Sequence, residues 1–305
     1  MSGRIFLHIG PPKTATTSLQ IGLQGLHIEG ASYLGTSQPR SPAQNAESNV
    51  LIRVSRADPG CTEEAQLLRA SLEGRVARGE TVIVSEEMFV VGDSEETIKD
   101  QLRRLVAFLE GLPTTVIVAL RDPRKAIPSY YQEIYRSLPF DLVRDFDRFT
   151  RDGRTYCFDY NALCSFIESL GVDLHLIDFR LLMVSEMALS RILGPSSELD
   201  ATLQLPKANV SKVSNDGELR FLPGSNLALL GETRSVKAII DCLGLRSLPG
   251  WKRAGRIARR IPLQRSRHIA LQLDAASEKH FLGSFESARR KWNPSIAPLF
   301  ESHRN

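Results

Sequence analysis

The chain has 305 residues and is 42% hydrophobic, which is enough to bury the core of one large α/β domain or of two modest ones. It carries 39 basic and 35 acidic residues, and the net charge of +4 gives no indication of a nucleic-acid partner. The four cysteines form no CxxC pair and lack zinc-ligand spacing, so we expect free thiols in a reducing compartment. No run approaches the roughly 20 apolar residues of a membrane span, and the run at residues 5–9 is too short for a secretion signal. We therefore expect a globular, cytoplasmic protein.

Short apolar runs alternate with helical patterns along the chain. Residues 4–9 predict a strand that meets a Gly/Pro turn, and leucines then recur at helical spacing from Leu19 to Leu26. Residues 81–85 predict a second strand, and an apolar stripe at i, i+4, i+7 and i+11 begins at Ile98.

The same alternation continues after this stripe. Residues 114–120 predict a third strand, buried on both faces. A helix is expected over 123–136, in which Pro128 either causes a kink or marks the point where regular helix begins. A helix over 159–170 precedes a fourth strand at 172–178. This order predicts a three-layer α/β fold, in which helices cover both faces of a parallel sheet.

Two stretches interrupt the order. Residues 36–62 are rich in Ser, Pro, Asn and Gly and predict a long loop. Residues 205–226 are also irregular, and helices are expected to resume near residues 233 and 268. Because the chain shows no internal repeat and no clear linker, we expect a single domain over 1–305. Its core would cover about 1–215, and its α-helical C-terminal portion about 216–305.

A loop of sequence GPPKTATTSLQ joins the first predicted strand to the first predicted helix, beginning at Gly10. At such a junction a phosphate meets free backbone N–H groups and the positive end of a helix. Lys13 adds a point charge, and the threonine and serine hydroxyls add further donors. The alternative is a helix N-cap, because Ser or Thr caps a helix without any ligand. The loop differs from the GxxxxGK[ST] loop of nucleoside triphosphatases, which requires Lys after a second Gly.

Two further groups follow strand ends. Arg121 ends the third strand, at the carboxyl edge where open α/β folds bind ligands, and Ser129 lies eight residues later. A guanidinium can bind two phosphate oxygens and a hydroxyl can donate to a third, although an ion pair with Asp122 is the alternative. Glu86 and Glu87 end the second strand, and in an extended chain they face opposite sides, so only one is expected to face this edge. The alternative for this pair is a helix start or a surface acid pair.

These segments resemble the bacterial type of sulfotransferase that uses 3'-phosphoadenosine 5'-phosphosulfate. PKTATTSL is similar to the 5'-phosphosulfate loop of that family, with Ala15 in place of the family's Gly; we expect Ala15 to adopt helical dihedral angles. Arg121, Pro123 and Ser129 fall in register with the family's 3'-phosphate motif. The SEE sequence is similar to the SSE of bacterial members, which favours Glu87 as the base with Glu86 in reserve. His8, inside the first strand, is expected to be a packed core residue.

The resemblance implies a P-loop nucleoside-triphosphatase-like fold and the transfer of a sulfonate group to a hydroxyl, which leaves adenosine 3',5'-bisphosphate and needs no metal. It implies that Glu87 takes the acceptor proton and that Lys13 stabilises the bridging oxygen. KANVS at 207–211 resembles a short motif before the donor-closing segment of bacterial members, which makes Asn209 and Ser211 further candidate site residues. The donor-binding residues that the resemblance implies are Lys13, Thr14, Ala15, Thr16, Thr17, Ser18, Arg121 and Ser129.

Other functions stay open at this point. A phosphotransferase of the same fold is one alternative. A polyanion- or membrane-surface-binding protein is another, because residues 251–268 carry seven Lys or Arg and no acid, although a solvated helix face is the plainer reading. The sequence does not choose among a carbohydrate, a glycolipid and a small metabolite as acceptor, and it gives no oligomeric state.

Overall fold

The computed structural model describes residues 3–40, 46–143, 145–197, 199, 201–206, 234–244 and 271–296. The chain divides into two compact units. The first comprises Met1–Ala126, Gly153–Val210 and Lys279–Asn305, and the second comprises Ile127–Asp152 and Ser211–Glu278. The single domain expected from the sequence stays a prediction.

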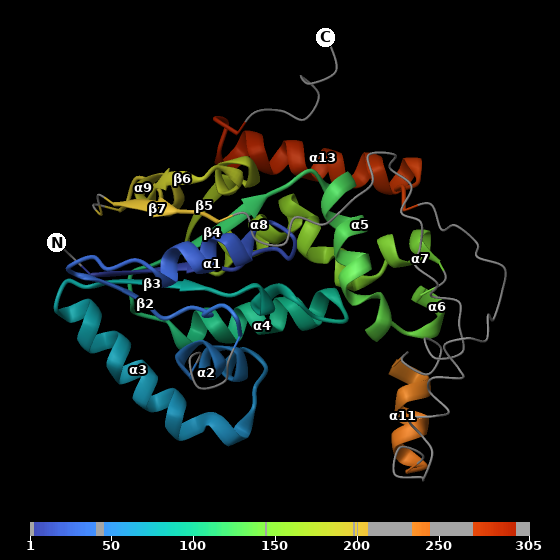
Figure 1. Cartoon of the computed structure of the whole chain (residues 1–305), viewed down its shortest axis with the longest axis horizontal. Helices are drawn as coiled ribbons and strands as arrows, with labels where there is room; N and C mark the ends of the chain where they lie inside the picture. The colour runs from blue at the N-terminus through green and yellow to red at the C-terminus, as the bar shows by residue number, and fades with distance from the viewer. Residues whose placement is uncertain are drawn as a thin grey trace. The chain divides into compact units, whose positions relative to one another are not determined.

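A five-stranded parallel sheet forms the centre of the first unit (Figure 1). In spatial order its strands are β2 (Ala31–Tyr33), β3 (Thr81–Ser85), β1 (Arg4–His8), β4 (Thr114–Leu120) and β5 (Asp173–Asp178). The register pairs His8 of β1 with Ser85 of β3 and with Ile117 of β4. The carboxyl ends of β3, β1 and β4 therefore lie side by side at one edge of the sheet.

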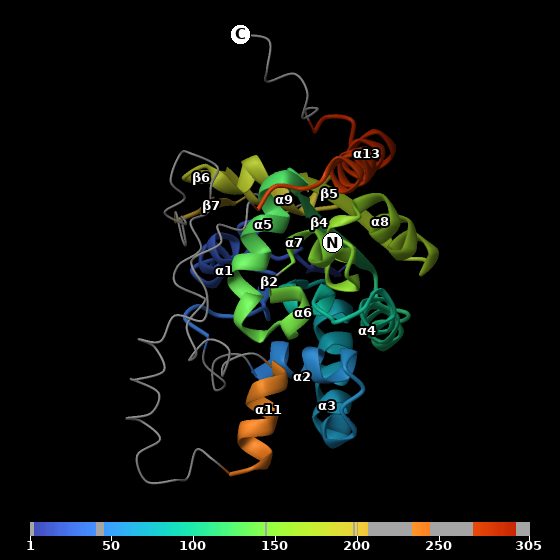
Figure 2. The same cartoon turned by 90° about the vertical axis from the view of Figure 1, so that its right-hand side faces the viewer.

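Helices cover both faces of this sheet (Figure 2). One face packs on α1 (Thr16–Gln24), α9 (Leu189–Leu193) and the hairpin of β6 (Glu186–Ala188) and β7 (Thr202–Gln204). The helices of the opposite side are α4 (Glu95–Phe108), α8 (Tyr160–Ser169), α3 (Thr62–Ala77) and α2 (Ala46–Ser55). The expected α/β fold with a parallel sheet flanked by helices is thus confirmed.

Apolar residues drive this layering. All seven residues of β4 are buried, as expected for a strand covered on both faces. On α4 the stripe that begins at Ile98 is buried throughout and ends at Leu109, directly after the helix. The strands expected at 81–85 and 114–120 have the predicted bounds, and Pro128 lies inside α5 (Pro123–Ile134).

The long loop expected over 36–62 is a wrong prediction. This stretch contains α2 and a 3₁₀ helix, Pro59–Cys61. The Ser and Asn residues of this stretch gave no helical signal, because tertiary contacts stabilise the helix. Leu51 is buried, and Arg104 of α4 donates to the backbone carbonyl of Ser55 at 3.1 Å. The edge strand β2 was not predicted either, because three half-buried residues give no periodic signal.

The second unit is helical in the part that the structure describes. It contains α6 (Phe140–Val143), α7 (Phe146–Thr150) and α11 (Arg234–Cys242), while α5 and α13 (Ala275–Trp292) run from one unit into the other. The ring of Tyr131 lies 4.9 Å from that of Phe149 and 5.2 Å from that of Phe146, so these aromatic residues form a cluster in the described part of this unit. The helical C-terminal portion is confirmed: α11 begins where expected, whereas residue 268 lies outside the described residues and α13 begins at Ala275.

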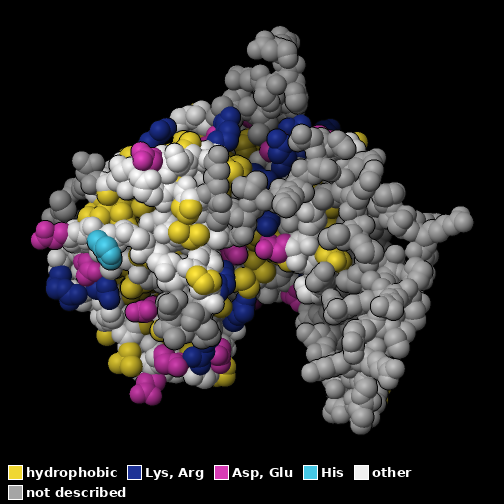
Figure 3. Space-filling view, viewed as in Figure 1, with side chains coloured by type: hydrophobic (Ala, Val, Ile, Leu, Met, Phe, Trp, Pro, Cys, Tyr) yellow, Lys and Arg dark blue, Asp and Glu magenta, His cyan; other side chains and the backbone are white. Residues whose placement is uncertain are grey.

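The four cysteines are free thiols, as expected, and the described surface carries charges of both signs. Cys61, Cys157 and Cys164 are buried, Cys242 is exposed, and all four are free thiols. On the face shown in Figure 3, acidic and basic side chains are interspersed over the described residues. Within those residues, no helix combines the length and the apolar character needed to cross a bilayer.

His8 is a packed core residue, as expected, at 1% exposure. Its Nδ1 lies 2.9 Å from the Ser85 hydroxyl of the neighbouring strand. Burial lowers the pKa of His8 from 6.5 to about 4, because desolvation disfavours the charged imidazolium. In the unfolded chain the imidazole would take up a proton near pH 6.5.

We therefore expect His8 to make stability depend on pH. Its contribution is fully present above about pH 6.5 and is lost as the pH falls toward 4, because the unfolded chain then binds one proton more than the folded chain. The loss amounts to about 3 kcal/mol at most, at 1.36 kcal/mol per pKa unit. Urea unfolding between these pH values should show this slope in the wild-type protein and a shallower one in His8→Asn, which keeps a polar atom near Ser85. Parallel slopes would contradict the assignment.

Candidate functional site

The loop between β1 and α1 turns sharply against the end of β3. Gly10 has a φ of +91°, which favours glycine, and a Cβ placed on it would lie 3.2 Å from the Cβ of Glu87. The Thr14 side chain is fully buried, and its hydroxyl donates to the carbonyl of Pro11 at 2.6 Å. An internal hydrogen bond therefore stabilises the loop, and the loop packs directly against Glu87.

Two residues of the loop have left-handed backbones. Lys13 has a φ of 66° and Ala15 a φ of 62°. The expectation that Ala15 adopts helical dihedral angles is therefore wrong, since α1 begins only at Thr16. A left-handed conformation costs an L-residue with a Cβ roughly 1–2 kcal/mol, which glycine does not incur.

The N-cap residue of α1 is Ala15, which makes no side-chain hydrogen bond to the helix. This observation does not favour the N-cap alternative, in which Ser or Thr caps the helix without a ligand. Thr16 in the first turn instead donates its hydroxyl to Glu87 Oε2 at 2.5 Å. Lys13, Thr17 and Ser18 also have partners of their own in the fold.

Arg121 reaches the loop from the end of β4. Its Nη1 donates to the backbone carbonyl of Lys13, and its guanidinium stacks on the ring of Phe179 at 4.6 Å. Its backbone N–H donates to the Tyr160 hydroxyl at 3.2 Å, and its carbonyl accepts from that hydroxyl at 2.9 Å. These contacts fix Arg121 beside the loop.

Arg121 is half-buried, and its guanidinium is not fully hydrogen-bonded. Its Nε has no hydrogen-bond partner within the described part of the chain. Burial lowers the pKa of Arg121, against smaller opposing effects of Tyr160 and Asp122. The alternative of an ion pair with Asp122 is not favoured, because that carboxylate is bound by Arg124 at 2.8 Å.

The two glutamates at the end of β3 have different surroundings. Glu86 is fully buried: its Oε1 accepts from Met88 N–H at 2.9 Å and from Arg40 Nη2 at 3.0 Å, and its Oε2 accepts from the Thr36 hydroxyl and from Arg40 Nη1 at 3.3 Å. Glu86 caps the 3₁₀ helix Glu87–Val90, so the helix-start alternative describes this residue.

Glu87 faces the loop and remains partly exposed, at 25% for its side chain. Besides Thr16, it contacts Arg40, whose Nη2 lies 3.4 Å from its Oε1. The expectation that the two glutamates face opposite sides is wrong, because Glu87 begins a 3₁₀ helix and both carboxylates bond Nη2 of Arg40. They differ instead in exposure, since Glu86 is buried and Glu87 is not.

The structure brings Lys13, Thr14, Ala15, Thr16, Glu87 and Arg121 together at the carboxyl ends of three adjacent strands. Ser129 lies on α5 in the second unit. The candidates Asn209 and Ser211 and the basic stretch 251–268 lie outside the described residues. Sequence reasoning missed Arg40 and Phe179: Arg40 falls in the supposed loop 36–62, and a single aromatic residue after β5 carries no motif.

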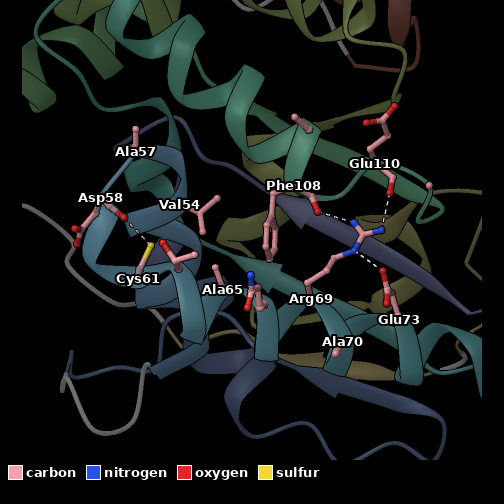
Figure 4. Close-up of a pocket in the computed structure, with 14 residues that line it drawn as sticks. Val54, Ala57, Asp58, Cys61, Ala65, Arg69, Ala70, Glu73, Phe108 and Glu110 are labelled. Carbon is pink, nitrogen blue, oxygen red and sulfur yellow. Dashed lines mark hydrogen bonds and ion pairs between the residues drawn. The ribbon is translucent and has the colours of Figure 1, made fainter.

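A separate groove of about 850 Å³ lies between α2, α3 and α4 (Figure 4). None of the site residues lines it. Its most prominent charged group, Arg69, donates to Glu73 at 2.7 Å and to the carbonyls of Phe108 at 2.5 Å and Glu110 at 2.7 Å (Figure 4). These bonds tie α3 to the end of α4, so this groove is explained by packing between helices.

The left-handed backbone of Ala15 can be tested by substitution. Ala15→Gly should leave the free energy of unfolding unchanged or raise it by up to about 1 kcal/mol, because relief of strain offsets the greater entropy of the unfolded chain. The matched Ala70→Gly, on the exposed face of α3, should lower it by about 1 kcal/mol. Chemical denaturation measures both. An equal loss in the two variants would contradict the left-handed assignment.

No protein-family model matches the chain, and neither does any curated protein or solved structure. What the protein does is therefore inferred from the residues of the site and their geometry.

Proposed function

We propose that the protein is a sulfotransferase of P-loop-like fold, which transfers a sulfonate group from 3'-phosphoadenosine 5'-phosphosulfate to an acceptor hydroxyl. The observation that carries this proposal is the hydrogen bond from Arg121 to the loop at Lys13, with Glu87 bonded to the same loop from the other neighbouring strand. The proposed base and the guanidinium of Arg121 thus contact the same segment, at the edge where open α/β folds bind their ligands.

Two positions for anionic groups support the choice of donor. The N-terminus of α1, whose N-cap residue Ala15 has no capping side chain, is proposed to bind a 5'-phosphosulfate through its backbone N–H groups. Arg121 is half-buried with a buried, unpartnered Nε, and an anion such as a 3'-phosphate would offset the cost of its desolvation. These residues fit a nucleotide that carries two separate phosphates.

Glu87 is the proposed general base. It takes the proton of the acceptor hydroxyl as that oxygen attacks the sulfur, and the bond from sulfur to the bridging phosphate oxygen breaks in line. Lys13 and the loop N–H groups stabilise the charge that develops on the leaving oxygen. Glu86 is less suited to this role, because its four hydrogen bonds occupy the acceptor positions of both of its oxygens.

The second phosphate site predicts a preference among nucleotides. By calorimetry the wild-type protein should bind adenosine 3',5'-bisphosphate roughly 10- to 100-fold more tightly than AMP, as a charge-assisted contact provides. ATP should bind weakly, and magnesium should have no effect. Arg121→Gln should lose the preference, whereas Arg78→Gln, which alters an exposed arginine at the end of α3, should keep it. Equal affinity of the wild-type protein for AMP would argue against the second phosphate site.

The role of Glu87 predicts a separation of binding from turnover. Glu87→Gln should lower sulfonate transfer by roughly 100-fold or more, since the hydroxyl proton has no acceptor, with little change in affinity for the bisphosphate. Transfer is followed with a ³⁵S-labelled donor and a panel of sugars, glycolipids and small hydroxyl compounds. Glu80→Gln, at the opposite end of β3, serves as the control. Normal transfer by Glu87→Gln would show that the base is Glu86 or another residue.

A further inference from the structure

Glu86 is a fixed anchor at the edge of the sheet. A carboxylate offers about four acceptor positions. In Glu86 these are occupied by a backbone N–H, a threonine hydroxyl and both Nη atoms of Arg40. Because the side chain is also fully buried, its carboxylate has one orientation.

This anchor fixes Arg40 in turn. A guanidinium that binds both oxygens of one carboxylate is held in the plane of that carboxylate. In this orientation Nη2, which bonds Glu86 at 3.0 Å, also lies 3.4 Å from Oε1 of Glu87. Burial alone would lower the pKa of Arg40, but the two carboxylates outweigh it and the pKa is raised, so Arg40 carries its charge.

The segment that precedes Arg40 is hydrogen-bonded to β3 and to α1. Gly35 lies so close to β3 that a Cβ there would be 2.5 Å from the backbone nitrogen of Ser85. Thr36 N–H donates to the Ser85 carbonyl at 3.1 Å, and the Gln38 side chain donates to Gln20 of α1 at 2.6 Å. The position of Arg40 is therefore set by the same elements that carry the loop and Glu87.

We infer that Arg40 is a positioning residue for the base: it holds Glu87 through the carboxylate oxygen that Thr16 does not contact. The inference rests on the proposed function, because it takes Glu87 as the group that receives the acceptor proton. With Thr16 on Oε2 and Arg40 on Oε1, each oxygen of the carboxylate has a donor that orients it.

A purely structural role for Arg40 makes a different prediction. Such a role would consist of neutralising the buried Glu86, and any cation that pairs with Glu86 would fulfil it. Holding Glu87 as well requires the planar fork of a guanidinium, since the ammonium of lysine is a single point charge. Arg40→Lys therefore separates the two roles in a variant that keeps the charge needed for folding.

The test compares folding, donor affinity and turnover in the same variants. Arg40→Lys should keep the melting temperature and the bisphosphate affinity of the wild-type protein, while kcat falls roughly 100-fold, as expected when a reacting group is misplaced. In Arg40→Ala, dilute guanidinium chloride should restore part of the turnover, and sodium chloride at equal ionic strength should not. Arg78→Gln, an exposed arginine at the end of α3, is the matched control.

A kcat of Arg40→Lys equal to that of the wild-type protein would overturn the inference and leave the proposed function standing. So would equal effects of guanidinium and sodium chloride on Arg40→Ala. Absence of sulfonate transfer by the wild-type protein would instead overturn the proposed function and this inference with it.

Discussion

The hydrogen bond that Arg121 donates to the carbonyl oxygen of Lys13 joins the end of β4 to the loop that follows β1. The guanidinium is half-buried and stacks on the ring of Phe179, and the Tyr160 hydroxyl bonds the backbone of Arg121. The bond places the cationic group next to the loop without neutralising it, because its acceptor is a carbonyl and not a carboxylate. A carboxylate partner would leave Arg121 little attraction for an anion, whereas a carbonyl partner leaves its charge available.

The parallel sheet makes this contact possible. Since β3, β1 and β4 are adjacent and parallel, the chain leaves all three strands at the same edge, and short connections bring the groups that follow them together. The close approach of the loop to Glu87 depends on Gly10, where a side chain would meet Glu87 itself. The strained backbone at Lys13 and Ala15 is maintained by the surrounding fold, as is common at binding sites.

The two glutamates show how one sequence motif provides two physical environments. Glu86 is buried and saturated with hydrogen bonds, while Glu87, one residue later, is partly exposed and bonded to the loop. Arg40 contacts both, so the buried carboxylate serves to orient a cation toward the exposed one. A structural ion pair and a proposed base thus belong to one network, whose anchor lies in the core.

Local patterns in the sequence were sufficient for the main strands, for α4 and for the positions of Lys13, Glu87 and Arg121 at strand ends, because periodicity and turn residues act over a few neighbouring positions. They were not sufficient for α2 or β2, whose stability comes from contacts with α4 and β3. Nor could they show that Ala15 is left-handed, that Arg124 binds Asp122, or that Arg40 reaches Glu86 across 46 positions of the chain. Those features depend on which surfaces meet when the chain folds, and only the tertiary structure decides that.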